Sequence, residues 1–97
     1  MSGWQISACA RNDLTAVYAE GILRFGAAQF LKYRSEIEDC FAVLAALPRL
    51  GREYTGASQP IRVHFHKAHV IAYRIIDDTE IIILRVLPVR ANWKEHL

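Results

Sequence analysis

The chain has 97 residues, of which 53% are hydrophobic and 23% are charged, and its formal net charge is +2. This length suits one domain, residues 1–97, and the balanced composition excludes a disordered or low-complexity protein. The net charge is too small to argue by itself for nucleic-acid binding, because proteins that bind through phosphates usually carry a strongly basic surface stripe, and direct sequence-specific DNA binding is not expected.

The first expected element is a short strand at about residues 4–9, where "WQISACA" alternates loosely between apolar and polar positions. A helix follows, with apolar side chains recurring every three or four residues from Leu14 to Phe25. Asn12 or Asp13 is expected to cap its start, and Gly26 ends it.

A second helix is expected from Ala27 to Leu47, where apolar side chains form one stripe. They are Phe30, Tyr33, Ile37, Cys40, Phe41, Leu44 and Leu47. Pro48 ends this helix, because the residue before a proline is disfavoured in the helical conformation. The short connection between the helices predicts an antiparallel helical hairpin.

The C-terminal part is expected to form strands after one loop, residues 48–60, that is rich in turn-forming residues. Strand-like segments occupy about residues 61–66, 69–76 and 80–87, and a polar tail at residues 90–97 is long enough for one or two helical turns. The order βααβββ predicts an α+β domain, in which the helical hairpin packs on one face of an antiparallel sheet and a short tail or helix closes the chain.

Neither the N-terminal segment nor the apolar runs predict export. "MSGWQISACARND" lacks the basic stretch and apolar run of a secretory signal, and residues 81–84 fall far short of the ~20 apolar residues that span a bilayer. Cys9 and Cys40 do not have the spacing of a disulfide framework, so we interpret both as reduced thiols in the core. These features predict a cytoplasmic protein without membrane association.

Two arginines, Arg74 and Arg85, interrupt the isoleucine-rich arms of the last hairpin. If Asp77 to Glu80 form a tight even-length turn, Ile76 lies opposite Ile81, and paired residues share a face of the sheet. The face under the helices would then carry Ile71, Tyr73, Ile75, Ile82, Leu84 and Val86. The opposite face would carry Val70, Ala72, Arg74, Ile76, Ile81, Ile83, Arg85 and Leu87.

The preceding strand divides in the same way, and only its apolar residues, Ile61, Val63 and Phe65, are expected in the core. The second face would therefore hold Arg62, His64, His66, Arg74 and Arg85 among isoleucines and valines. That face has too much apolar area for an ordinary solvent face and too much charge for a core, which predicts a binding face. The alternative is a solvated face over which the arginines extend.

Metal binding, nucleophilic catalysis and cofactor binding have less support in the sequence than a binding face. His64 and His66 point the same way on a strand, but no third or fourth ligand is fixed near them, so no metal site is predicted. Ser58 lacks the context of a nucleophile, and the chain has no glycine-rich phosphate loop, so no cofactor is expected. One catalytic possibility stays open, because a face of arginines and histidines can cleave RNA without a metal.

Six short motifs occur in the order seen in one family of bacterial toxins. They are "ARNDL" at the start of the first helix, "RFG" at its end, "LPRLGRE" after the second helix, "HVIAYRI", "IIILRVLPVR" and a tail closing in "HL". With these motifs the chain resembles the ParE branch of the ParE/RelE superfamily of toxin–antitoxin modules over nearly its whole length. The fold of that family, a helical hairpin against an antiparallel sheet, agrees with the elements expected above.

The resemblance implies the toxin of a type II toxin–antitoxin module, of the kind that stabilises plasmids. Its partner would be a cognate antitoxin whose largely disordered C-terminal segment folds over the toxin, which gives a hetero-oligomer. The ParE branch poisons DNA gyrase, whereas the RelE branch cleaves messenger RNA on the ribosome. The expected function is therefore non-catalytic inhibition of DNA gyrase, and the alternative is a ribosome-dependent endonuclease.

Departures from the RelE pattern favour the gyrase-directed branch. Arg90 matches the C-terminal arginine of the RelE branch, but Val70 stands at the position of its sheet arginine. No tyrosine follows Tyr73, and the lysines that precede the strands in the RelE branch are missing. His96 and the other histidines keep the ribonuclease alternative open.

The tail "VRANWKEHL" places Trp93 beside Arg90 and Lys94, a combination enriched at interface anchors. The resemblance implicates the C-terminal residues of gyrase-directed toxins in toxicity, so Arg90, Trp93 and Lys94 are predicted to contact the target. The alternative is that Trp93 seals the end of the core. On the sheet, the residues predicted to contact the antitoxin or the target are Arg62, His64, His66, Arg74 and Arg85.

Overall fold

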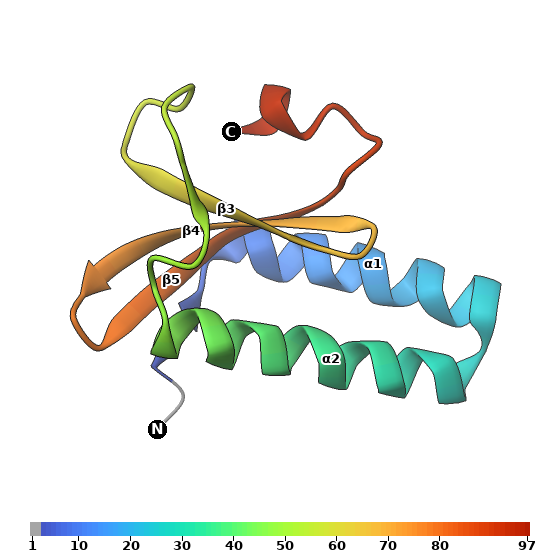
Figure 1. Ribbon diagram of the computed structural model, residues 1–97. Helices are drawn as coiled ribbons and strands as arrows, with labels where there is room; N and C mark the ends of the chain where they lie inside the picture. The colour runs from blue at the N-terminus through green and yellow to red at the C-terminus, as the bar shows by residue number, and fades with distance from the viewer. Residues whose placement is uncertain (1–2) are drawn as a thin grey trace.

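The computed structural model describes residues 3–97, in which a helical hairpin covers one face of a five-stranded sheet (Figure 1). The elements are β1 (Trp4–Ile6), α1 (Ala8–Phe25), α2 (Ala27–Ala46), β2 (Arg52–Tyr54), β3 (Ile61–His66), β4 (His69–Asp77), β5 (Glu80–Pro88) and a 3-10 helix, η1 (Trp93–His96). The α+β class, the hairpin on one face and the short C-terminal helix are confirmed.

The sheet is open and mixed. Its strand order is β1-β5-β4-β3-β2, with β1 parallel to β5 and every other neighbouring pair antiparallel. The edge strand β2 adds to the expected elements, because residues 52–54 fall in the segment predicted as a loop. A strand of three residues is too short to show an alternating pattern in the sequence, so only its pairing with β3 reveals it.

The first helix begins earlier than expected because Ser7 caps it, in place of Asn12 or Asp13. The Ser7 hydroxyl oxygen accepts a hydrogen bond from the Ala10 N–H at 3.0 Å, and the same hydroxyl donates to the Leu84 carbonyl at 2.9 Å. One side chain therefore caps α1 and attaches it to β5.

The expectation that both cysteines lie in the core is wrong for Cys9. The early start of α1 places Cys9 on the first turn of the helix, where it is exposed. Cys40 lies on α2, half-buried against the core. Both thiols are free.

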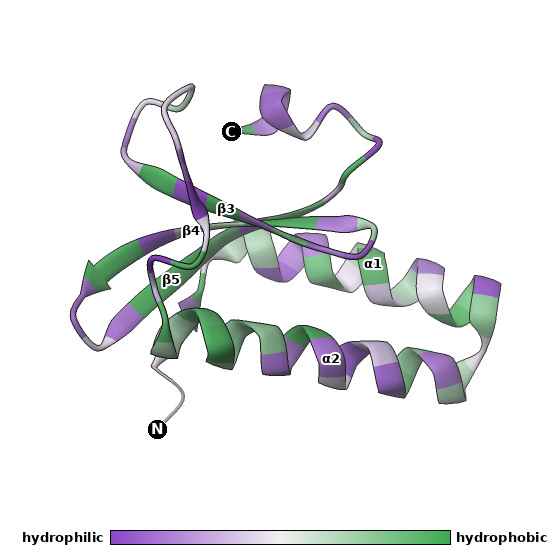
Figure 2. Cartoon of the chain, viewed as in Figure 1, coloured by the Kyte–Doolittle hydropathy of each residue, from purple (hydrophilic) through white to green (hydrophobic). Residues whose placement is uncertain are grey.

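The core between the hairpin and the sheet is apolar, and we call the sheet surface that contributes to it the helix face. Its buried residues are Ala10, Leu14, Ile37, Phe41, Leu44, Ala45, Ile71, Tyr73, Ile81, Ile83 and Val86. Trp4 of β1 adds an edge-to-face contact with Phe41, with ring centroids 5.1 Å apart. Figure 2 shows hydrophobic residues along much of β4 and β5, as strands covered on both sides require.

The opposite surface of the sheet, the tail face, carries a second apolar cluster. Its buried residues are Ile61, Val63, Val70, Ala72, Leu87 and Trp93. The C-terminal tail folds back over this surface in Figure 1, on the side away from the hairpin. The chain therefore buries apolar side chains on both faces of one sheet.

The register of β4 and β5 is as predicted at both ends and is shifted by one residue between them, so Ile81 pairs with Ile75 and not with Ile76 as expected. Asp77 pairs with Glu80, so the tight turn is confirmed, and Ala72 pairs with Arg85 as expected. Between these points Tyr73 pairs with Ile83, which leaves Leu84 as the extra residue of a β-bulge. Because side chains alternate with a period of two, this shift inverts the faces of residues 81–84.

The predicted assignment of side chains to the two faces of the sheet is wrong for part of β5 and for β3. On β5, Ile81 and Ile83 lie on the helix face, and Leu84 lies on the tail face. On β3, Val63 pairs with Ala72 of the tail face, whereas Arg62 lies opposite Tyr73 of the helix face. The pattern of β3 alone could not decide this, because a sheet with two apolar clusters accepts apolar side chains on either face.

Candidate functional site

The tip of the helical hairpin extends beyond the sheet (Figure 1). A groove lies beside this part of the hairpin. It has a volume of about 460 Å³ and runs between the hairpin, the β3–β4 turn and the C-terminal end of β5. The apolar and aromatic residues that line it are Val17, Tyr18, Phe25, Phe30, Pro88 and Val89. We call this site the hairpin groove.

Large apolar side chains around the hairpin groove have no cover. Phe25 lines the groove and is 66% exposed, and Leu23 on the same turn is 86% exposed. Ile22 and Leu31 are exposed as well, although of these four residues only Phe25 lines the groove. Large exposed apolar side chains beside an apolar groove indicate a surface that another molecule covers.

The rim of the hairpin groove is positively charged. Arg24, Lys67 and Arg90 line it, and Glu20 is the one carboxylate among the lining residues. Glu20 lies 3.1 Å from the Arg24 guanidinium and 3.9 Å from that of Arg90. The excess of positive charge over an apolar floor suits an occupant that has an apolar side and acidic side chains.

Tyr33 and His69 form a hydrogen bond of 2.5 Å at the inner edge of the hairpin groove. Burial raises the pKa of Tyr33 to about 12, so its hydroxyl keeps its proton and donates. Burial also lowers the pKa of His69, so its ring is neutral and Nδ1 accepts. The pair ties α2 to the start of β4 without adding a charge.

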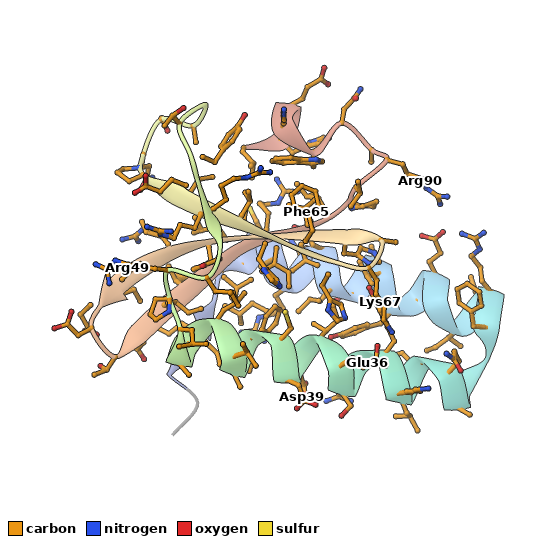
Figure 3. All side chains as sticks on the ribbon, in the orientation of Figure 1. Glu36, Asp39, Arg49, Phe65, Lys67 and Arg90 are labelled. Carbon is orange, nitrogen blue, oxygen red and sulfur yellow. The ribbon has the colours of Figure 1, made fainter. Side chains whose placement is uncertain are left out.

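A second link between α2 and the sheet lies beside this pair. The Lys67 ammonium donates to the Glu36 carboxylate at 2.5 Å, and the two side chains point toward one another in Figure 3. This hydrogen bond lowers the pKa of Glu36. Burial, and then the Lys67 charge, lower the pKa of His66, whose Nε2 lies 4.0 Å from Glu36.

The five sheet residues predicted to share one binding face do not share one. Arg62 and His64 pair with Tyr73 and Ile71, so they lie on the helix face, and His66 follows them toward α2. Arg74 and Arg85 belong to the tail face, through the pairings of β4 with β5. The single shared face is therefore corrected, although Arg62 and Arg74 both line one cleft at the end of the sheet.

Arg85 is engaged within the chain. Its Nε and Nη2 donate to the two carboxylate oxygens of Asp13 at 2.7 Å and 3.0 Å, and its Nη1 donates to the His96 carbonyl at 3.3 Å. The Asp13 hydrogen bond raises the pKa of Arg85. This arginine joins α1, β5 and the tail.

In the tail, Trp93 packs inside the molecule. Only 9% of it is exposed, and its ring lies 5.6 Å from each of the Tyr54 and Phe65 rings, measured between centroids. Trp93 thus closes the tail-face cluster, whereas Lys94 is exposed above its ring at 5.6 Å. Arg90 projects from the chain with 78% of its side chain exposed, and its one ion pair within residues 3–97 is the 3.9 Å contact with Glu20 (Figure 3).

Comparison with known proteins decides which family has this arrangement. Residues 5–93 match the family described as ParE toxin of type II toxin-antitoxin system, parDE. The chain belongs to this family. Its structure is similar to the solved structure titled "Chromosomal ParDE TA system from P. aeruginosa", with a TM-score of 0.73 and 24% identity over 93% of this chain and 98% of that chain. A search of curated proteins gave no match.

The motifs of this ParE-family toxin meet in pairs in the fold. Asp13 of "ARNDL" binds Arg85 of "IIILRVLPVR". Tyr73 of "HVIAYRI" accepts a hydrogen bond from the Gly51 N–H and donates to the Pro48 carbonyl, both in "LPRLGRE". The resemblance therefore rests largely on residues that hold the toxin together.

The sequence pattern of the toxin did not reveal the residues of the hairpin groove. The available signal was "ILRF" at the end of α1, where Leu23 and Phe25 are large apolar residues at neighbouring positions that one helix face cannot bury together. Among residues 3–97 no three histidine, cysteine, aspartate or glutamate side chains gather as a metal ion would require. Over the same residues, no helix is long and apolar enough to cross a membrane.

Proposed function

We propose that this ParE-family toxin is a non-catalytic poison of DNA gyrase, and that a cognate antitoxin neutralises it. The observation that carries the proposal is the family match over residues 5–93. Gyrase acts on DNA in the cytoplasm, so the toxin is proposed to work there.

The placement of the basic sheet residues supports a non-catalytic mechanism, because no histidine is among the lining residues of the cleft that Arg62 and Arg74 share. Metal-free RNA cleavage needs arginine and histidine side chains that converge on one phosphate. Here Arg85 is occupied by Asp13, and the His69 ring accepts a hydrogen bond from Tyr33. No observation favours the RelE-like ribonuclease, so it serves as the competing outcome of the test.

The hairpin groove is the proposed site of the antitoxin. A disordered segment that folds on binding gains most from an apolar floor that buries its apolar side chains and a charged rim that orients it. Phe25 and Phe30 supply the floor, and Arg24, Lys67 and Arg90 supply the rim. The proposed occupant is therefore an amphipathic, acidic segment of the antitoxin.

The deciding experiment uses purified, antitoxin-free protein in two parallel assays. The first measures supercoiling of relaxed plasmid by gyrase, and the second measures cleavage of a messenger translated in a cell-free system. We expect lost supercoiling and intact message. Cleaved message with normal supercoiling would refute the proposal and favour the ribonuclease.

The tail variant Arg90→Glu with Lys94→Glu tests the predicted target contact, because both side chains are exposed and their loss leaves Trp93 in place. We expect this variant to inhibit gyrase at least about tenfold more weakly, which corresponds to ~1.4 kcal/mol. Lys32→Glu on α2 reverses one charge away from the tail, as a control for charge reversal, and should inhibit like the parent. Equal inhibition by all three proteins would remove the tail from the target contact.

A further inference from the structure

A second cleft lies at the opposite end of the sheet from Arg90, where Arg49 projects in Figure 3. It has a volume of about 890 Å³ and is bounded by residues 55–60, the start of β3 and the far end of β4. Three guanidinium side chains line it, those of Arg49, Arg62 and Arg74, with Tyr54 beside them. We call it the arginine cleft.

The positive charge of the arginine cleft is only partly neutralised within residues 3–97. Glu53 is the one carboxylate among its lining residues, and its side chain is 76% exposed and 3.4 Å from Arg62. Arg62 is held in place by the carbonyls of Gly51, at 2.6 Å, and Arg49, at 3.3 Å. A fixed cation therefore faces the cleft together with two cations that lack a carboxylate partner.

Of the three arginines, Arg74 gives the strongest indication that an anion binds in the cleft. Its guanidinium makes no hydrogen bond or ion pair with any part of residues 3–97, and its Nε is buried without an acceptor. On β4 it lies opposite Ile82, in apolar surroundings. A permanently charged group that is partly buried without a partner destabilises the folded chain, and an anion bound to its terminal nitrogens would offset this cost.

We propose that the arginine cleft binds phosphate groups. Guanidinium groups match phosphate oxygens with paired hydrogen bonds, and a phosphate has enough acceptors for several arginines at once. Tyr54 adds an aromatic ring at the same place, on which a base can stack, so nucleic acid is the favoured source. Such contacts carry no sequence information, so the proposed site would not by itself read a DNA sequence. The proposal does not depend on gyrase being the target.

The first test measures thermal unfolding in sodium phosphate and in sodium chloride at equal ionic strength. Arg74→Gln removes the unpartnered cation, and Arg11→Gln on the exposed side of α1 is the matched loss of charge. We expect phosphate to raise the Tm of the parent and of Arg11→Gln, and this rise to be lost in Arg74→Gln. In sodium chloride, the Tm of Arg74→Gln should be at least as high as that of the parent. A lost response to phosphate would then not be due to a destabilised variant.

Equal rises in all three proteins would overturn the proposal, because phosphate then acts by general exclusion from the protein surface. Stabilisation by polyglutamate without any by phosphate would also overturn it, in favour of a carboxylate site.

A second measurement identifies the source of the phosphate, by fluorescence anisotropy of a labelled single-stranded oligonucleotide over a range of salt concentrations. For a nucleic-acid site, Arg49→Gln with Arg74→Gln should weaken binding and lower the salt slope by about one for each lost phosphate contact. If the variant binds the oligonucleotide like the parent while its phosphate response in Tm is lost, the site takes free phosphate or a nucleotide.

Discussion

At the scale of single residues, the Asp13 carboxylate joins α1 to β5. It accepts two hydrogen bonds from Arg85, and one oxygen also accepts the Val86 N–H at 3.0 Å. That N–H lies on the edge of β5 beyond the three residues that pair with β1. The Asp13 carboxylate therefore accepts a hydrogen bond from the open edge of the sheet and also pairs with the Arg85 guanidinium.

Replacing Asp13 by alanine should lower the free energy of unfolding by roughly 1–3 kcal/mol, because it leaves the Val86 N–H and the Arg85 guanidinium without their acceptor. Urea denaturation measures the change as a lower midpoint with an unchanged slope. Asp39→Ala, at an exposed position of α2, is the matched control and should unfold like the parent. Equal midpoints for the two variants would show that Asp13 does not hold α1 to β5.

The histidines at the hairpin groove predict how stability depends on pH. Burial lowers the pKa of His69 and of His66 from the ordinary value of 6.5, so below pH 6.5 the unfolded chain binds more protons than the folded chain. Their contribution to stability is thus complete above that pH and is lost as the pH falls through the folded-state values. Glu36, with its pKa lowered from 4.5, acts in a separate and more acidic range.

We therefore expect the urea midpoint to fall between about pH 7.5 and about pH 5. His69→Asn keeps an acceptor for the Tyr33 hydroxyl and does not titrate, so it should reduce this fall. His96→Asn in the exposed tail should leave it unchanged. A midpoint that stays constant over this range in the parent would contradict the prediction.

At the scale of elements, the connection from α2 to β2 depends on one buried phenol. The Tyr73 hydroxyl accepts from the Gly51 N–H at 2.8 Å and donates to the Pro48 carbonyl at 2.6 Å. A Cβ at position 51 would overlap the Tyr73 ring, which explains a glycine there. Through these two bonds a strand of the sheet positions the loop that also presents Arg49 to the arginine cleft.

Tyr73→Phe should lower the free energy of unfolding by roughly 1–3 kcal/mol, because the buried N–H of Gly51 loses its acceptor and the Pro48 carbonyl loses its donor. Tyr54→Phe is the matched control, since the Tyr54 hydroxyl makes no hydrogen bond within residues 3–97. Chemical denaturation of both variants compares the two hydroxyls directly. Similar losses in both would mean that the Tyr73 hydroxyl is not what holds the loop.

At the scale of the whole molecule, two unpartnered surfaces lie at opposite ends. The hairpin groove offers an apolar floor with a cationic rim, and the arginine cleft offers three guanidinium groups in a lining of mixed polar and apolar residues. In Figure 3, Arg90 and Arg49 mark these two ends. Surfaces so different in chemistry suit different occupants, so a ligand at one should leave the other open.

Phe25→Glu should weaken binding of an acidic, amphipathic antitoxin segment by at least about tenfold, because it replaces an exposed aromatic anchor with a charge that the segment repels. Val43→Glu places the same charge at an exposed apolar position of α2 outside the groove and should bind like the parent. Isothermal titration calorimetry measures both. If Val43→Glu loses binding and Phe25→Glu keeps it, the antitoxin does not use the hairpin groove.

The local pattern of the sequence was sufficient for the helices, the long strands and the tight turn at residues 77–80. These depend on apolar spacing, on Gly26 and Pro48, and on turn residues, all of which act over a few neighbours along the chain. The family could also be inferred from the amino-acid sequence alone, because each motif that carries the resemblance is contiguous. None of these inferences required knowledge of which strands pair.

Only the tertiary structure decided the faces of the sheet and the location of the candidate sites. One extra residue, Leu84, inverts the faces of residues 81–84, and a bulge of this kind leaves no mark in an isoleucine-rich run. Pairing placed Arg62 and Arg74 on different faces, yet both reach the arginine cleft around the end of the sheet. The hairpin groove joins residues far apart in sequence, such as Phe25 and Arg90, so only the folded chain brings them together.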